Sequence, residues 1–247
     1  MKSILMADQD VGLEITQWLL SDYKQDIALV VTSSENEILE VVRQAKVPSL
    51  VFESTNQVHN YIQKSGIDLD IGFLVWWPKL IKHPLLKLPK QGFINTHPSL
   101  LPFNRGKHYN FWALVEQAPF GVSLHFAEDG IDNGNIVAQA TIPYGWEDNG
   151  AALYKKAKYE IVNLFKETYP TIRTLNIPQQ KQDLDRGSFH LADEIERASL
   201  INLDDSYRAR DLLNLLRART FVGYPACWFN DGINEYEVRV EITRKLQ

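Results

Sequence analysis

The sequence predicts an α/β fold in which helices cover both faces of a mostly parallel sheet. Four short apolar segments with β-branched residues are the expected strands, at residues 4–7, 27–31, 49–52 and 71–75. Three segments of helical period alternate with them, at residues 11–23, 35–46 and 56–65. Strands that alternate with helices form parallel sheets with both faces buried, which explains why these four strands are apolar throughout.

The middle of the chain continues this pattern around a polar turn. The expected elements are a short helix at residues 79–88, a strand at 93–96, a helix at 110–116 and two strands at 121–126 and 136–142. The last two strands alternate in polarity and flank a turn, so they form a hairpin-like pair. The lysines of the first helix, Lys79, Lys82 and Lys87, form either a solvated face or a cationic rim for an anionic substrate tail.

A change of composition after residue 176 divides the chain. A long amphipathic helix at 150–168 closes a first, Rossmann-like domain at residues 1–176, and the polar residues 177–187 form a linker. Residues 188–247 form a small C-terminal subdomain. It contains a helix around Leu212 to Leu216 and a β-hairpin with strands at 226–229 and 236–242.

Composition excludes several classes of protein. The 247 residues are 45% hydrophobic and 23% charged, with a net charge of −5 and no block of like charges, which argues against a general nucleic-acid binder. The single cysteine, Cys227, allows no intramolecular disulfide and no cysteine-based metal site. No run is apolar enough for a signal peptide or a membrane span, so we expect a cytoplasmic protein. Neither a Gly-x-Gly-x-x-Gly turn nor a Walker loop follows the first strand, which disfavours dinucleotide and P-loop enzymes.

Three polar residues stand out beside the central strands. Asn95 and His97 end the strand at 93–96 and share one face, and ligands of such sheets bind at the carboxyl ends of the strands. Asp132 lies in the next turn, between Gly130 and Gly134. An amide that stabilises an oxyanion, an imidazole that moves a proton and a carboxylate that orients it suit acyl transfer to an amine.

The alternative to a catalytic role is that His97 is a structural histidine and Asp132 a turn-forming aspartate. A serine nucleophile is disfavoured because the sequence has no Gly-x-Ser-x-Gly elbow. A metal site that adds His125 or His108 is possible in principle, but no His-x-x-x-His or Glu-x-x-His pair supports it.

The spacing of these residues resembles that of the folate-dependent formyltransferases. The matching segments are Asn95-Thr96-His97-Pro98-Ser99-Leu100-Leu101-Pro102, Arg105-Gly106, Gly121-Val122-Ser123-Leu124-His125 and Asp132-Asn133-Gly134-Asn135-Ile136. The resemblance covers roughly residues 1–175 and implies formyl transfer from N10-formyltetrahydrofolate, a cosubstrate, to an amine, without a metal. It implies that Asn95 holds the formyl oxygen, that His97 takes a proton from the amine and that Asp132 orients His97.

The resemblance also implies where the folate lies. The pterin is expected against the strand end with Trp76 and Trp77, and against the turn with Glu128, Asp129 and Ile131. Many relatives have smaller residues at the two tryptophan positions. A cis bond between Leu101 and Pro102 is a further expectation from the resemblance.

The C-terminal part bears on the acceptor. Residues 188–247 carry 8 Lys and Arg against 10 Asp and Glu, a poor start for binding tRNA. They resemble the tail of the sugar-nucleotide N-formyltransferases, which implies a homodimer that formylates a nucleotide-linked amino sugar. The acceptor is then a dTDP-4-amino-4,6-dideoxyhexose or its 3-amino isomer, for surface polysaccharide or O-antigen synthesis. The alternatives are a methionyl-tRNA formyltransferase and a non-catalytic folate- or nucleotide-binding module.

Candidate acceptor contacts follow from the same resemblance. The side chains of Asn104, Arg105 and Lys107 are expected to bind the sugar and diphosphate oxygens through charge-assisted hydrogen bonds. Phe221 and Tyr224 are expected to stack on the base. Alternatively, Asn104, Arg105 and Lys107 belong to a polar surface loop without a binding role. The two aromatic residues would then belong to the core of the small subdomain.

Overall fold

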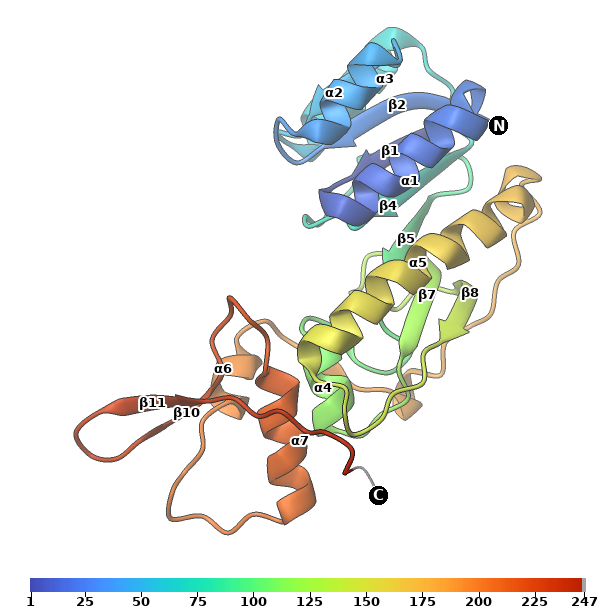
Figure 1. Ribbon diagram of the computed structural model, residues 1–247. Helices are drawn as coiled ribbons and strands as arrows, with labels where there is room; N and C mark the ends of the chain where they lie inside the picture. Colours follow the sequence, from blue (N-terminus) through green and yellow to red (C-terminus); the bar gives the residue numbers. More distant parts are fainter. Residues whose placement is uncertain (246–247) are drawn as a thin grey trace. The chain divides into compact units, whose positions relative to one another are not determined.

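A computed structural model describes residues 1–245 of the chain (Figure 1). Its helices are α1 (Gln9–Asp22), α2 (Glu37–Gln44), α3 (Thr55–Ser65), α4 (Tyr109–Val115), α5 (Gly150–Arg173), α6 (Glu194–Ala198) and α7 (Ala209–Arg219), with 3-10 turns η1 (Lys24–Asp26), η2 (Leu85–Lys87) and η3 (Leu184–Arg186). Its strands are β1 (Ser3–Ala7), β2 (Ile27–Thr32), β3 (Ser49–Val51), β4 (Ile71–Val75), β5 (Phe93–His97), β6 (Arg105–Gly106), β7 (Gly121–Ala127), β8 (Ile136–Thr141), β9 (Phe189–His190), β10 (Cys227–Asn230) and β11 (Glu235–Val238).

The main sheet has seven strands in the order β3-β2-β1-β4-β5-β7-β8. The pairs from β3 to β5 are parallel, and β7 runs antiparallel to β5. The neighbouring strands β7 and β8 enclose the polar turn, as expected for a hairpin-like pair. The predicted α/β class, with its mostly parallel sheet and its C-terminal helix and hairpin, is confirmed.

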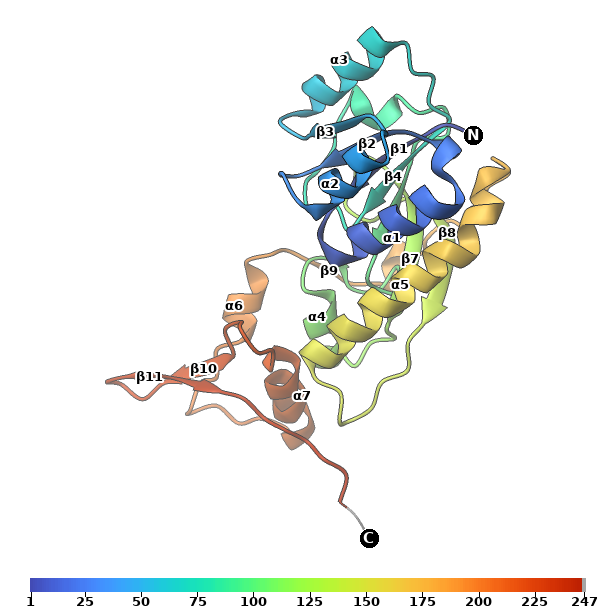
Figure 2. The same ribbon diagram turned by 45° about the horizontal axis from the view of Figure 1, so that its top comes forward.

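Helices cover both faces of the parallel strands (Figure 2). On one face, Ile4 and Met6 of β1 pack into a core that includes Val58 and Ile62 of α3. On the other face, the ring of Phe73 in β4 lies 5.4 Å from that of Phe165 in α5. Successive residues of a strand point to opposite faces, so burial of both faces explains the apolar strands.

The chain forms two compact units, each built from separate segments. The first contains Met1–His97, Ser123–Gln139 and Ile161–Gln182, and the second contains Pro98–Val122, Ala140–Glu160 and the residues from Asp183 onward. The boundaries expected from the sequence, after residues 176 and 187, stay a prediction about the domains of the chain.

The prediction of a helix at residues 79–88 is wrong. The structure has only the 3-10 turn η2 there, directly after Pro84. Proline lacks the N–H that a helix needs, and it disfavours helical backbone at the residue before it, here His83. The Lys79 ammonium donates to the Ser33 carbonyl oxygen at 3.4 Å and lies 5.2 Å from the Phe52 ring centre. The lysines therefore do not share one helical face.

Two other elements differ in length from the expectation. Helix α5 extends to Arg173, five residues beyond the predicted end, and β11 ends at Val238 rather than at 242. The extra turn of α5 carries Tyr169, which is fully buried and donates its hydroxyl to Asp26 at 3.2 Å. Burial, together with the Asp26 carboxylate, raises the pKa of Tyr169.

Replacing Tyr169 by phenylalanine should lower the free energy of unfolding by about 1 kcal/mol, the typical cost of losing one buried hydrogen bond. The ring stays in place, and Arg173 still pairs with the Asp26 carboxylate, which limits the loss. Urea unfolding measures the change. Tyr159→Phe on the same helix is the matched control, because this side chain is 72% exposed and should change stability little. Equal stability of the two variants would contradict the prediction.

Candidate active site

Asn95, His97, His125 and Asp132 form one polar cluster within the first compact unit. His97 Nδ1 lies 3.5 Å from one carboxylate oxygen of Asp132, and His125 Nε2 lies 3.5 Å from the other. Asn95 Nδ2 lies 3.1 Å from His125 Nε2. The structure therefore brings together all three predicted catalytic residues and adds a second histidine.

The register of β5 against β7 explains why the side chains of Asn95 and His125 meet. Asn95 is directly opposite His125, and His97 is opposite Ser123. Facing residues of antiparallel strands share a face of the sheet, and so do residues two apart on one strand. Between Asn95 and His97, the Thr96 hydroxyl accepts the Trp76 N–H at 2.9 Å and donates to the Leu74 carbonyl at 3.2 Å. This bridge fixes the end of β5 to β4.

Asp132 is positioned by an unusual turn. Its φ is 50°, a left-handed conformation that aspartate tolerates better than most residues. Gln182 Nε2 donates to the carbonyl oxygens of Asp132 at 2.9 Å and of Gly134 at 2.6 Å. A Cβ at Gly134 would collide with the carbonyl oxygen of Phe126. The turn thus needs a residue without a side chain at 134 and is supported by Gln182 from a distant part of the chain.

Gly134→Ala should reduce turnover at least about 10-fold, because the turn must shift to make room for the methyl group, and a small misplacement of a catalytic group can cost up to about 100-fold. Steady-state kinetics measures the loss, and thermal unfolding shows whether the fold survives. Gly66→Ala is the control. It lies at the end of α3 with φ 65°, where open space surrounds the added methyl group. This variant should lose some stability but keep kcat.

The contacts of His125 assign its proton. Its Nδ1 lies 2.9 Å from the Phe126 carbonyl oxygen, which can only accept, so Nδ1 carries the hydrogen. With the hydrogen on Nδ1, Nε2 is the acceptor of an Asn95 N–H. This contact holds the Asn95 amide in one orientation and leaves its second N–H available as a donor. His125 therefore positions the group that would stabilise an oxyanion.

Burial strengthens the electrostatics of the cluster. His97 and His125 are 5% and 2% exposed, and the Asp132 side chain is 14% exposed. Charges interact more strongly where water is excluded. A single carboxylate thus faces two imidazoles in a site with little access to water.

The donor atoms of His97, His125 and Asp132 lie within 4.8 Å of one another, a ligand set that zinc sites also use. However, the Asn95 amide directs an N–H at His125 Nε2, and a cation there would have to displace it. The expectation that the site works without a metal stays a prediction.

The expected folate residues lie at the carboxyl end of β4 and in the turn after β7, in the same unit as the cluster. Trp77 packs edge-on against Phe52 at 5.4 Å, and its buried indole N–H has no hydrogen-bond partner in residues 1–245. Trp76 has a φ of 51°. In the turn, Glu128 and Asp129 are exposed and Ile131 is 42% exposed. Their contacts with a folate stay predictions.

The expected acceptor residues lie in the second unit. Asn104 is fully buried and donates its side-chain amide to Glu116 at 2.9 Å and to Ser188 at 3.2 Å. The Arg105 guanidinium lies 6.0 Å from the Phe189 ring centre, and Lys107 is exposed.

The rings of Phe221 and Tyr224 contact each other edge to face, with centres 4.7 Å apart. Tyr224 is 60% exposed, whereas Phe221 also contacts Tyr154 at 5.6 Å. Lys107 and Tyr224 are therefore open to a ligand, and Asn104 acts through its protein contacts.

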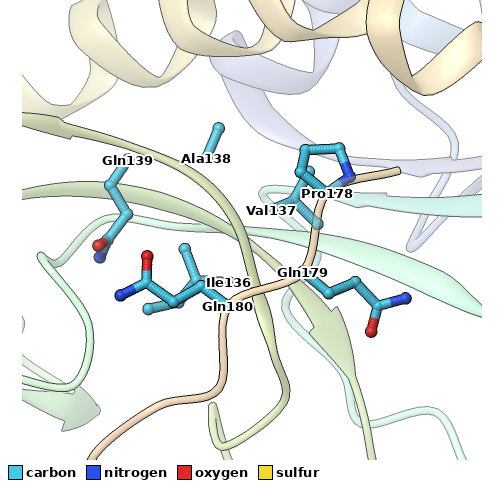
Figure 3. Close-up of a pocket in the computed structure, with 7 residues that line it drawn as sticks. All are labelled: Ile136, Val137, Ala138, Gln139, Pro178, Gln179 and Gln180. Atoms are coloured by element: carbon cyan, nitrogen blue, oxygen red, sulfur yellow. The ribbon is translucent and has the colours of Figure 1, made fainter. Parts of the chain in front are cut away.

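A separate cavity of about 370 Å³ lies between β8 and residues 178–180 (Figure 3). The backbones of Ile136 and Gln180 pair there through two hydrogen bonds of 2.8 Å. The lining side chains, which include Pro178 and Gln139, contain no titratable group. This cavity therefore offers no acid or base, whereas the polar cluster offers both.

Comparison with known proteins identifies the family. A model of the formyl transferase family matches residues 8–168, which include the whole polar cluster. The chain belongs to the formyl transferase family. A second model, described as the N-formyltransferase dimerization C-terminal domain, matches residues 194–244. The chain therefore combines a segment of the formyl transferase family with a C-terminal segment of the N-formyltransferase type.

Two curated relatives each match a little over 70% of the chain. The bifunctional polymyxin resistance protein ArnA of Wigglesworthia glossinidia brevipalpis is 31% identical over 71% of this chain and 26% of its own length. The methionyl-tRNA formyltransferase of Thermodesulfovibrio yellowstonii is 30% identical over 73% of this chain and 58% of its own length. The chain thus spans about a quarter of the first relative and little more than half of the second.

Solved structures share the fold over nearly the whole chain. A sugar N-formyltransferase from a Shewanella species has a TM-score of 0.80 and 19% identity, covering 100% of this chain and 99% of its own. An N-formyltransferase from Helicobacter canadensis, in complex with folinic acid and dTDP-3-aminofucose, has a TM-score of 0.72 and 18% identity, covering 94% and 84%. Within residues 1–245, no helix is both long enough and apolar enough to cross a bilayer.

Three residues that contact the predicted site residues have no assigned role in the sequence analysis beyond that of His125 as a possible metal ligand. The position of His125 in a strand opposite β5 makes it a partner of Asn95. No local sequence pattern points to Gln182 or Glu116, because each forms hydrogen bonds with residues distant in the sequence. The cis bond between Leu101 and Pro102, expected from the resemblance, is present.

Proposed function

We propose that this formyltransferase moves the formyl group of N10-formyltetrahydrofolate to the amine of a nucleotide-linked amino sugar. The acceptor is a dTDP-4-amino-4,6-dideoxyhexose or its 3-amino isomer, its product serves surface polysaccharide synthesis, and its expected location is the cytoplasm. The observation that carries the proposal is the buried contact of His97 and His125 with one Asp132 carboxylate, beside the Asn95 amide.

Each residue of the cluster has a task in this reaction. The amine nitrogen bonds to the formyl carbon, the bond from that carbon to N10 breaks, and the proton lost by the amine ends on N10. The free N–H of Asn95 stabilises the negative charge that develops on the formyl oxygen. His97 accepts the amine proton and returns it to the leaving nitrogen. Asp132 holds His97 in position and stabilises the imidazolium that forms.

The C-terminal domain supports a sugar amine as the acceptor. It belongs to the N-formyltransferase type, and its net charge of −2 is poorly suited to a polyanionic tRNA. The Helicobacter canadensis structure, which shares this fold, was obtained with folinic acid and dTDP-3-aminofucose. By analogy, Arg105 and Lys107 would contact the nucleotide from the loop that Asn104 begins, and Tyr224 would contact the base.

We further propose that the enzyme is a homodimer. The matched C-terminal family is described as a dimerization domain. In this part of the chain, Val222 and Ile233 are 89% and 87% exposed, which leaves apolar surface for a second copy to cover.

A parallel assay tests the proposed function. The enzyme is incubated with N10-formyltetrahydrofolate and, in separate reactions, with dTDP-4-amino and dTDP-3-amino sugars, UDP-amino sugars and charged initiator tRNA. Mass spectrometry of the acceptor should show one added formyl group on a dTDP-amino sugar. Formylation of the tRNA alone would establish the methionyl-tRNA formyltransferase, and folate binding without turnover of any acceptor would establish a binding module.

A further inference from the structure

A hydrogen-bonded cluster around Glu116 occupies the second compact unit, apart from the formyl-transfer residues. One carboxylate oxygen of Glu116 accepts from Asn104 Nδ2 at 2.9 Å and from the Ser188 hydroxyl at 2.7 Å. The other oxygen lies 2.7 Å from His190 Nε2. Glu116 thus joins three residues that are 12 to 74 positions away in the sequence.

His190 has a carboxylate at each of its two ring nitrogens. Its second nitrogen, Nδ1, lies 3.0 Å from a carboxylate oxygen of Glu194, so both nitrogens face acceptors. Only the doubly protonated ring can donate to both. The ring also stacks on Trp112, with centres 3.8 Å apart and planes at 8°, a geometry that favours a cation over the indole. The hydrogen bond from His190 lowers the pKa of Glu194, which fits a charged pair.

The cluster fixes the conformation of residues 104–107. Strand β9 pairs in parallel with β6, through hydrogen bonds of 3.0 Å from the Arg105 N–H to the Ser188 carbonyl and from the Lys107 N–H to the His190 carbonyl. Asn104 adopts a φ of 52°, a left-handed conformation that its amide contacts to Glu116 and Ser188 stabilise. The loop is therefore held by backbone pairing along one side and by Glu116 at its start.

We propose that Glu116 is a positioning residue for the acceptor: its charged contact with His190 fixes residues 104–107 in the conformation that binds the diphosphate of the nucleotide. The inference rests on the proposed function, and it adds that Glu116 sets the affinity of the enzyme for the acceptor. A preformed loop binds more tightly because its ordering cost is met before the ligand arrives. Loss of the contact should therefore weaken binding of the acceptor and leave the chemical step intact.

The charged groups around His190 come from several elements. The carboxylates that face the ring are Glu116, at the end of α4, and Glu194, in α6. The cations nearby are Arg105 and Lys107 on the paired segment, and Arg197 acts on Glu194. The hydrogen bond from His190 holds the pKa of Glu194 below its usual value in the folded protein, so the contribution of Glu194 to stability is complete above that usual value and is lost as the pH falls through the lower one.

The test compares wild type with Glu116→Gln, which keeps the shape and one acceptor oxygen but removes the charge. We expect the KM for the amino-sugar acceptor to rise about 10-fold, consistent with losing one charged hydrogen bond, while kcat stays within about twofold and the KM for the folate is unchanged. Calorimetry with dTDP alone should show the same loss of affinity.

Two further variants separate the outcomes. Glu35→Gln removes the charge of an exposed pair with Arg43 in the first unit and should change none of these values. His190→Gln should match Glu116→Gln, and the double variant should add little to either, because both remove one interaction. If Glu116→Gln fails to fold, Ser188→Ala replaces it, with an expected rise in acceptor KM of about threefold.

Unchanged acceptor KM and dTDP affinity in these variants, with a wild type that binds and turns over the acceptor, would overturn the inference. A wild type that neither binds dTDP nor formylates the sugar would instead overturn the proposed function.

Discussion

Replacing His97 by alanine is expected to lower kcat for formyl transfer at least about 100-fold, the usual cost of removing a general base. The imidazole is 5% exposed and faces Asp132, and in the proposed mechanism it is the group that accepts the amine proton. The KM for both substrates should change little, since binding depends on other residues. Single-turnover kinetics measures the chemical step directly.

Variants of two other histidines serve as comparisons for the His97→Ala variant. His59→Ala in α3 lies outside the cluster and should retain wild-type turnover. His125→Gln should lose about 10-fold, because it leaves Asn95 in place but frees its amide to rotate. Near-full turnover of the His97→Ala variant would remove His97 from the mechanism, whatever the other two variants show.

Asp132→Asn should reduce kcat on the order of 10,000-fold, comparable to the loss of the aspartate in a Ser-His-Asp triad. The change removes the negative charge that two imidazoles share and turns an N–H toward a ring nitrogen. The backbone should tolerate it, since asparagine adopts a φ near the observed 50° as readily as aspartate. Kinetics over a range of pH, together with the melting temperature, separates lost chemistry from lost structure.

The matched control is Asp68→Asn, an exposed carboxylate that pairs with Lys90 on the surface. This variant should keep wild-type kcat. If Asp132→Asn retained a tenth or more of the wild-type rate, Asp132 would be a turn-forming residue and His97 would act without a charged partner.

Much of the fold was predictable because it depends on local patterns. Segments such as 71–75 are apolar at every position, and that pattern is typical of a strand buried on both faces. The pairing of Asn95 with His97 on one face follows from alternation along β5 alone. Local periodicity therefore located both the sheet and two residues of the polar cluster.

The remaining features depend on contacts between distant segments. The register that places His125 opposite Asn95 is set by the whole sheet, and nothing near either residue specifies it. Glu116, Ser188 and Asn104 meet across up to 84 positions of sequence. The error at 79–88 has a local cause, since charged and apolar residues there follow a helical spacing that Pro84 overrides.

The bonds from Gln182 to the turn around Asp132 limit how this enzyme can be divided. A fragment that ended at residue 176 would keep Asn95, His97, His125 and Asp132, yet it would lose the side chain that holds the Asp132 carbonyl. Chimeras that exchange C-terminal parts between relatives should therefore place their junction after Gln182. A junction before Gln182 would exchange the residue that holds the Asp132 turn together with the C-terminal part of the chain.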